Sequence, residues 1–316
     1  MTDQTITDQT MTDQTVIEPM PIRQETRNAN IFPPFVARQS FIELNARARA
    51  QSLMDSGSWR ELVDAFERIE SPWLPEQSIA PQSDDGCVVL KGTIAAQPTV
   101  VIALEGGFQA GSMGEVSGAK MTAAIDLAAR DSKNGKPSAA VLLLETGGVR
   151  LQEANLGLAA IAEVISSLLA LRQHAPIITV IAGTVGCFGG MSLVAGLSSY
   201  IVMTREARLG LNGAEVIEQE SGIEEFDSSD HALTWAINGG EQRVGMGVAD
   251  ALVLDDVQKL AAAVRRCVAA GLPGVHRSQQ VKLYRDRIAA LDVSRQFDPL
   301  SLRDSWKSDT KEGETK

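Results

Sequence analysis

Two pairs of glycines follow apolar segments of the sequence and could bring backbone N–H groups close to a ligand. They occur in Thr146-Gly147-Gly148 and in Phe188-Gly189-Gly190. Glycine has no side chain to keep a ligand away from the backbone, and the first N–H groups of a helix have no partner within that helix. Two such turns side by side would present two N–H donors to one oxygen atom. That arrangement is an oxyanion hole, which stabilises negative charge that develops on a carbonyl oxygen.

The segments around these turns have the pattern of parallel strands joined by a helix. Apolar runs at 139–145 and 176–182 have the length of buried strands, and residues 151–173 between them carry apolar side chains at helical spacing. Strand, helix and strand over this distance form a βαβ unit with parallel strands. Turns that follow parallel strands lie at their carboxyl ends and line a crevice there. We therefore expect both glycine pairs at one edge of a sheet.

Other functional interpretations of these turns and their surroundings find less support in the residues. A phosphate-binding loop is disfavoured because neither turn has the spacing GxxxxGK[ST] or GxGxxG. The three histidines, His174, His231 and His276, have no metal-ligand spacing, and no GxSxG motif occurs. Glycine pairs also serve packing alone, and the pattern by itself favours neither packing nor catalysis. Glu145 and Arg150 flank the first turn, where a structural ion pair and a substrate contact are equally compatible with the sequence.

The rest of the chain supplies further elements of an α/β fold. We expect helices at 40–53, at about 59–69, 117–131, 191–197, 257–270 and 276–291. We expect an antiparallel strand pair at 87–91 and 99–104, a strand at 200–204, and a turn at 242–247 leading to a short strand at 249–254. Grouped into domains, these are an N-terminal helical segment at 39–75 and a main domain at 76–307 with C-terminal helices.

The two ends of the chain are predicted to be irregular. Thr-Asp-Gln-Thr occurs at 2–5, 7–10 and 12–15, and so polar a repeat cannot bury enough surface to offset the cost of ordering the chain. Residues 1–38 are therefore expected to form a disordered tail, and 308–316 a frayed polar end.

Composition excludes several classes of protein. The formal net charge of −11 argues against nucleic acid as a partner, because neutralising phosphates requires a basic face. Cys87, Cys187 and Cys267 lie far apart with no CxxC pair, so neither a zinc ribbon nor another metal site is expected, and the thiols should be reduced. No apolar run reaches the ~20 residues that a membrane span needs. We expect a cytoplasmic protein that does not contact a membrane.

At the glycine turns the sequence resembles a known family. Gly111-Ser112-Met113-Gly114 and the segment 146–154 are similar to the Gly-Ser-Met-Gly and Gly-Gly-Ala-Arg-Met-Gln-Glu motifs of acyl-CoA carboxyltransferase subunits. Residues 142–160, 185–193 and 209–227 resemble the β subunits of malonate decarboxylases more closely. The resemblance spans about 40–254 and implies an α/β, crotonase-like fold of ββα units with helical N- and C-terminal extensions. The absence of a four-cysteine zinc ribbon argues against membership among acetyl-CoA carboxylases.

The resemblance also implies an activity and partners. It implies decarboxylation of a malonyl thioester carried on the phosphoribosyl-dephospho-CoA arm of an acyl carrier protein, with no cofactor or metal held by this chain. The expected partners are a homologous γ subunit, which shares the active site, the carrier subunit, and an α subunit that exchanges acetyl for malonate on the carrier. Transfer of the carboxyl group to biotin and a non-catalytic scaffold are the alternatives.

The resemblance finally assigns residues to the site. The expected oxyanion donors are Gly147, Gly148, Gly189 and Gly190. The expected contacts to the substrate and its pantetheine arm are Gly111, Ser112, Met113, Gly114, Arg150, Gln152 and Phe188.

Overall fold

Seven strands form one sheet whose order in space follows their order along the chain. The computed structural model describes residues 38–292, 294 and 298–313, all of which belong to one unit of the chain. The strands are β1 Arg60–Leu62, β2 Cys87–Ile94, β3 Gln97–Leu104, β4 Ala139–Leu143, β5 Ile177–Ile181, β6 Tyr200–Met203 and β7 Ala251–Leu252. The first three pair antiparallel, and β3 to β7 pair parallel. The parallel β4–β5 pair confirms the predicted βαβ unit.

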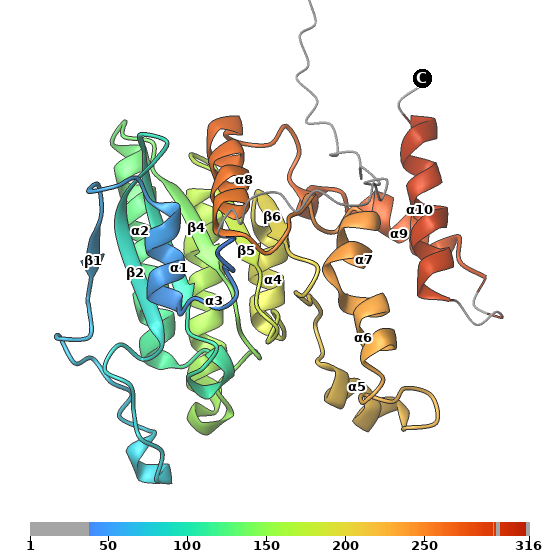
Figure 1. Ribbon diagram of the computed structural model, residues 1–316, viewed down its shortest axis with the longest axis horizontal. Coiled ribbons are helices and arrows are strands. Elements are labelled where there is room, and N and C mark those ends of the chain that lie inside the picture. Colours follow the sequence, from blue (N-terminus) through green and yellow to red (C-terminus); the bar gives the residue numbers. More distant parts are fainter. Residues whose placement is uncertain (1–37, 293, 295–297, 314–316) are drawn as a thin grey trace, which may run out of the picture. The chain divides into compact units, whose positions relative to one another are not determined.

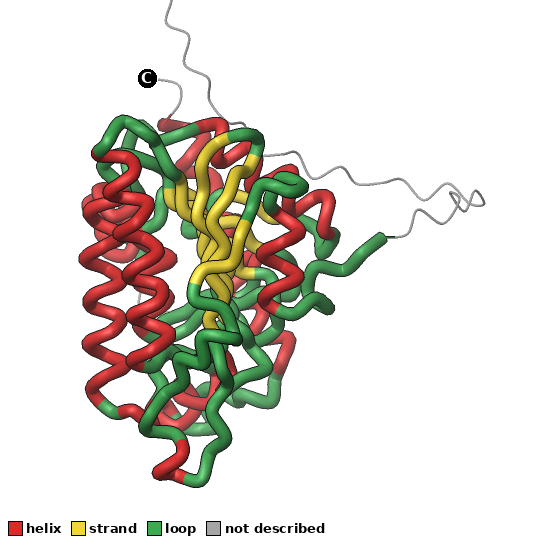
Figure 2. Tube along the Cα trace, turned by 90° about the vertical axis from the view of Figure 1, so that its left-hand side faces the viewer, coloured by secondary structure: helices red, strands yellow, loops and turns green. Residues whose placement is uncertain are grey.

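Helices cover both faces of the sheet (Figures 1 and 2). Helices α2 (Glu115–Lys133), α3 (Asn155–Leu171) and α4 (Gly190–Leu197) pack on one face, and α1 (Ala46–Leu53) and α8 (Val257–Ala270) on the other. Successive side chains of a strand point to opposite faces. In β3, Val100 and Ile102 therefore belong to one core and Val101 and Ala103 to the other. The result is a three-layer α/β fold in which the strands are buried on both sides.

The remaining elements surround this sheet. Beyond β6 lie α5 (Ala214–Ser221), α6 (His231–Asn238), α7 (Gly240–Gly245), α9 (Val281–Ala289) and α10 (Pro299–Gly313). Short 3-10 turns occur at η1 (Pro75–Gln77), η2 (Gln109–Gly111), η3 (Leu151–Glu153) and η4 (Arg277–Gln279). Helix α6 begins at His231, because the Asp230 carboxylate accepts a hydrogen bond from Leu233 N–H and caps the helix.

The structure corrects three of the predicted elements. The expected helix at 59–69 is absent from this part of the described chain, where Arg60–Leu62 instead forms the edge strand β1 opposite Val89–Lys91. Pairing with β2 satisfies this backbone and overrides the local helical pattern. The predicted turn at 242–247 lies largely within helix α7, and α10 continues to Gly313 although regular structure was expected to end before 308.

The predicted N-terminal tail lies outside the described residues except for Arg38. Among the described residues, no helix is long and apolar enough to span a membrane, and no group of three metal-ligating side chains converges.

Candidate functional site

Beyond the ends of the parallel strands, a second set of pairings brings the two glycine turns together. Single β-bridges join Thr146 to Cys187 and Cys187 to Leu209. In the first of these bridges, Thr146 N–H donates to Gly186 O at 2.8 Å and Phe188 N–H donates to Thr146 O at 3.0 Å. The segments that follow β4, β5 and β6 therefore continue side by side after the main sheet has ended. This places both glycine pairs at the carboxyl edge of the sheet, as predicted.

The two turns touch through their backbones. A Cβ atom built on Gly148 would lie 3.4 Å from Gly189 Cα, and one built on Gly189 would lie 3.2 Å from Gly148 Cα. Both residues also have positive φ, at 117° and 60°, a region that side chains disfavour. A side chain at either position would strain the backbone, and one at Gly189 would also be tightly packed against Gly148. Glycine here is a requirement of the close contact.

Three of the four predicted oxyanion donors already have acceptors in the protein. Gly147 N–H donates to Ala110 O at 2.9 Å, and Gly148 N–H donates to Thr146 Oγ1 at 3.1 Å. Gly189 N–H donates to Leu211 O at 2.8 Å. These bonds hold the turns in shape, and as they stand they leave those N–H groups unavailable to a ligand.

One N–H group remains open in each turn. Gly190 is the first residue of α4, and Val149 follows Gly148; neither N–H has an acceptor among the described residues. Val149 pairs with Met113 in a parallel bridge, whose bonds run from Met113 N–H to Gly148 O and from Arg150 N–H to Met113 O. In this bridge Met113 bonds to Gly148 and Arg150, the two neighbours of Val149, so the N–H of Val149 itself points away from Met113. Val149 N lies 3.9 Å from a Cβ built on Gly189, so it faces the second turn.

The loop at 111–114 supports the first turn from the side. Met113 bridges Val149, and Gly111 packs so closely that a Cβ there would lie 1.8 Å from Glu145 O. The Met113 side chain is fully buried in the core, and only Ser112 of this loop is partly exposed. The structure thus brings the loop to the first turn, with most of its atoms facing inward.

Arg150 lies beneath the first turn and is 1% exposed. Its guanidinium donates to Asp85 Oδ1 at 2.6 Å, to Glu153 Oε1 at 2.8 Å and to Ser112 O at 3.1 Å. Of the two interpretations that the sequence left open, this geometry fits the structural ion pair, although the partners are Asp85 and Glu153 rather than Glu145. Glu145 pairs instead with Arg49.

Burial and hydrogen bonding set the charges of the two acids around Arg150. Burial raises the pKa of Asp85 above its ordinary value, although Arg150 opposes that effect. Burial alone would also raise the pKa of Glu153, but hydrogen bonds from Ser71, from Glu115 N–H and from Arg150 together lower it. The network holds the chain between the 111–114 loop and η3 in a fixed position.

The other two predicted contacts lie next to the turns with limited exposure. The Phe188 side chain is buried, with the Arg208 guanidinium carbon 5.5 Å from its ring centroid. Gln152 is partly exposed in η3, and its carbonyl accepts a hydrogen bond from Gln77 at 2.6 Å.

Neither of the buried cysteines near the site has the properties of a nucleophile. Burial raises the pKa of the Cys87 thiol to about 12 and raises that of Cys187 as well. A nucleophilic cysteine needs a thiolate, which burial disfavours. Neither thiol is therefore a candidate nucleophile at this edge of the sheet.

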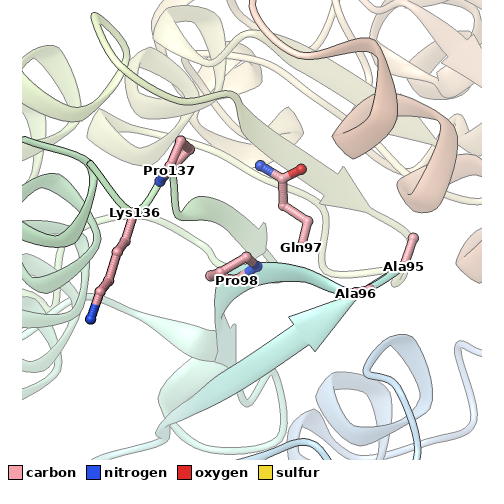
Figure 3. Close-up of a pocket in the computed structure, with 6 residues that line it drawn as sticks. All are labelled: Ala95, Ala96, Gln97, Pro98, Lys136 and Pro137. Atoms are coloured by element: carbon pink, nitrogen blue, oxygen red, sulfur yellow. The ribbon is translucent and has the colours of Figure 1, made fainter. Parts of the chain in front are cut away.

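A surface hollow elsewhere on the molecule is unconnected with the site. It is lined by Ala95, Ala96, Gln97, Pro98, Lys136 and Pro137 (Figure 3). Ala95 and Ala96 form the turn before β3, Gln97 and Pro98 begin β3, and Lys136 and Pro137 precede β4, at the end of the sheet opposite the glycine turns. Its walls are mainly alanine and proline, with Lys136 as the one ionisable side chain.

Two touching turns, each with an open N–H group, lie at the carboxyl edge of a parallel sheet in a crotonase-like fold. The chain belongs to the carboxyl transferase domain family, whose model matches residues 43–299. It is 39% identical over 281 residues to the malonyl-S-ACP:biotin-protein carboxyltransferase MADC of Malonomonas rubra, covering 85% of this chain and 88% of that protein.

Solved structures agree with this assignment. A chain of a Pseudomonas malonate decarboxylase hetero-tetramer in complex with malonate is 54% identical, with a TM-score of 0.83, over 85% of this chain and 98% of that one. A chain of the Pseudomonas MdcD-MdcE hetero-dimer is 49% identical, with a TM-score of 0.69, over 81% and 99%.

Proposed function

We propose that this chain is the β-type subunit of a malonate decarboxylase and removes carbon dioxide from a malonyl thioester. The observation that carries this proposal is the contact of the two glycine turns with Val149 N–H and Gly190 N–H open beside it. The likeness to the Pseudomonas malonate decarboxylase chains supports malonyl as the acyl group.

Two N–H donors suit this reaction because of where its charge goes. When the bond between the carboxylate carbon and the α-carbon breaks, the electron pair moves into the thioester and carbon dioxide leaves. The resulting enolate carries its charge mainly on the thioester oxygen, where Val149 and Gly190 would donate. Donors placed for that oxygen stabilise the transition state more than the ground state, as catalysis requires. One oxyanion donor contributes about 2.7–4 kcal/mol.

The enolate must then take a proton on the α-carbon to give the acetyl thioester. The described chain offers no ionisable side chain in hydrogen-bond contact with the two open N–H groups. We propose that water or a group on the partner subunit supplies the proton.

The partner and the substrate carrier follow from the same proposal. Leu151 and Leu211 belong to the segments next to the two turns, and Leu158 and Leu193 lie in the first turns of α3 and α4. These four leucines are 83%, 60%, 57% and 53% exposed. A homologous γ-type subunit that covers them would exclude water from the enolate. The malonyl group would arrive on the phosphoribosyl-dephospho-CoA arm of an acyl carrier subunit, charged by an α subunit, and the 111–114 loop would form one wall for that arm.

Carboxyl transfer to biotin is the second candidate, and it is favoured by the likeness to the malonyl-S-ACP:biotin-protein carboxyltransferase of Malonomonas rubra. The same enolate forms, but the carboxyl group passes to a ureido nitrogen of biotin on a carrier, and the proton that this nitrogen loses balances the one that the enolate α-carbon takes up. Inhibition of turnover by avidin in a reconstituted system would assign the chain to this second reaction.

The proposal is tested by reconstituting the chain with its partner subunit and malonyl-carrier and following carbon dioxide release. Gly190→Pro removes one N–H at the first helical position, where proline is tolerated. We expect turnover to fall by about 10²–10³-fold, as for loss of one oxyanion donor. Wild-type turnover in a folded, assembled Gly190→Pro enzyme would contradict this role and favour the scaffold alternative.

Gly190→Ala is the matched control. It keeps the N–H but adds a Cβ that would lie 2.8 Å from Ile161 Cδ1, so it reports the cost of crowding alone. We expect Gly190→Ala to retain far more turnover than Gly190→Pro. Equal losses in both would show that packing against Ile161, and not the N–H, is what matters.

A further inference from the structure

The N-terminal segment 38–53 is hydrogen-bonded to the carboxyl edge of the sheet, where the first glycine turn also lies. Asp255, just before α8, accepts hydrogen bonds from Phe41 N–H at 2.8 Å and from Ile42 N–H at 3.0 Å. Helix α1 follows and lies against the sheet (Figure 1), with Ala50 and Leu53 fully buried. The segment therefore has one fixed end beside α8 and leads from there to the carboxyl ends of β3 and β4.

Two glutamates that follow β3 and β4 hold α1 there. Glu105, directly after β3, accepts a hydrogen bond from Ala46 N–H at the start of the helix, at 2.9 Å. Glu145, two residues after β4, forms an ion pair with Arg49. Arg49 and Glu145 are 7% and 8% exposed. A negative charge at a helix N-terminus and a buried ion pair both favour one fixed placement of α1.

The surrounding chain is shaped to admit the Glu145 side chain. A Cβ on Gly183 would lie 1.9 Å from Glu145 Oε1, and one on Gly106 would lie 2.8 Å from Glu145 Cδ. The Arg49 guanidinium also donates hydrogen bonds to Phe41 O at 3.0 Å and to Ile42 O at 2.5 Å. A buried carboxylate without its cation would be costly, so this pair fixes both partners.

Glu145 also directly precedes the first glycine turn, Thr146-Gly147-Gly148. Its carbonyl packs against Gly111, and the next residue, Thr146, holds Gly148 N–H and bridges Cys187. A displacement of Glu145 would therefore pass directly to the backbone that carries Val149 N–H. Misplacing a reacting group by about 1 Å can cost about 10²-fold in rate.

We propose that Arg49 is a positioning residue, which sets the place of Val149 N–H through its ion pair with Glu145. This inference rests on the proposed function for its effect on turnover. Its structural content, that the pair restrains the turn, is independent of which reaction the site performs.

The decisive variant removes both charges. Arg49→Met alone leaves Glu145 buried without a cation and can unfold the chain, whereas Arg49→Met with Glu145→Met replaces the pair by apolar side chains of similar length, which is often neutral for stability. In the assembled enzyme we expect the double variant to stay folded, with a slightly lower unfolding midpoint because Phe41 O and Ile42 O lose a donor. We expect it to lose about 10–100-fold in kcat, with KM little changed. Arg49→Lys, which keeps the charge, should recover part of that loss.

Arg47→Lys is the matched control on the same helix. Arg47 pairs with Glu61 and Asp84 and not with Glu145, and lysine keeps a cation beside the buried Asp84, so this change should leave kcat unchanged. Amide hydrogen exchange of peptides covering 146–151 gives a readout that needs no turnover, and we expect faster exchange in the double variant only. Wild-type exchange and kcat in a stable double variant would show that the pair serves stability alone. If the wild-type enzyme shows no turnover, the proposed function fails while the exchange comparison still decides this inference.

Discussion

Thr146 is the residue whose side chain shapes the first turn most directly. Its hydroxyl oxygen accepts the buried Gly148 N–H at 3.1 Å, and its own backbone bridges the second turn through Gly186 and Phe188. The side chain is fully buried, so no water replaces that acceptor. Gly148 in turn contacts Gly189, which makes this hydroxyl part of the contact between the turns.

Replacing Thr146 by valine keeps the shape of the side chain but removes the acceptor. The Gly148 N–H would then be buried without a partner, which costs about 1–3 kcal/mol. We expect the free energy of unfolding, measured by urea denaturation, to fall by that amount. Thr146→Ser keeps the hydroxyl and should lose clearly less. A valine variant as stable as the wild type would mean that Gly148 N–H needs no acceptor in the protein.

Among the elements, the β2–β3 hairpin has a strained turn, and substitutions in that turn could relieve the strain. Ile94 pairs with Gln97, so Ala95 and Ala96 form a two-residue turn, and both have positive φ, at 51° and 63°. These values fit a type I′ turn, for which Asn-Gly is preferred and alanine is costly. The Asp55 carboxylate compensates by accepting hydrogen bonds from Ala95 N–H and Ala96 N–H.

Changing Ala95 to asparagine together with Ala96 to glycine should therefore stabilise the chain. Relief of left-handed strain outweighs the added freedom of glycine in the unfolded state, and we expect a gain of about 1 kcal/mol. Thermal unfolding measures the gain, and turnover should not change because the hairpin lies at the opposite end of the sheet. Asp55→Asn in the wild-type background should lower the midpoint, and a lower midpoint in the Asn-Gly variant would contradict the assignment of strain.

At the scale of elements, periodicity predicted most of the fold and missed what depends on distant contacts. The strands at 139–145 and 176–182 and the helix at 257–270 follow from apolar spacing, and the structure has them within a few residues. The edge strand β1 could not be predicted, because Arg60–Leu62 becomes a strand only by pairing with β2, about 30 residues further along.

The sequence predicted where the candidate site lies but not which N–H groups in it are open. The glycine spacing indicated two turns at one sheet edge, and the structure has them in contact. Which N–H groups stay open depends on acceptors such as Ala110 O and Leu211 O, whose positions no local pattern gives. Val149 was missed for this reason. Its only signal was its position directly after Gly147-Gly148, at the end of a turn whose earlier N–H groups are engaged.

For the whole molecule, the exposed leucines around the turns are the feature that a single chain leaves unexplained. Leu151 directly follows the buried Arg150, and Leu211 provides the carbonyl that holds Gly189 N–H, so both are attached to the site. Exposed large apolar side chains that lie close together are typical of surfaces that a partner covers. Because an oxyanion hole is strongest away from water, the same partner that covers these leucines would complete the site.

Introducing charge on this face should therefore weaken assembly and activity together. Burying one leucine contributes about 1.5–3 kcal/mol, so Leu151→Asp with Leu211→Asp should weaken binding of the partner subunit by at least about 100-fold. Isothermal titration calorimetry with the purified partner measures this, and turnover should return at high partner concentration. Leu272→Asp changes a leucine that is also exposed, 42%, in the loop after α8, and serves as the control. Equal weakening by the control, or full affinity in the double variant, would place the partner on another face of the chain.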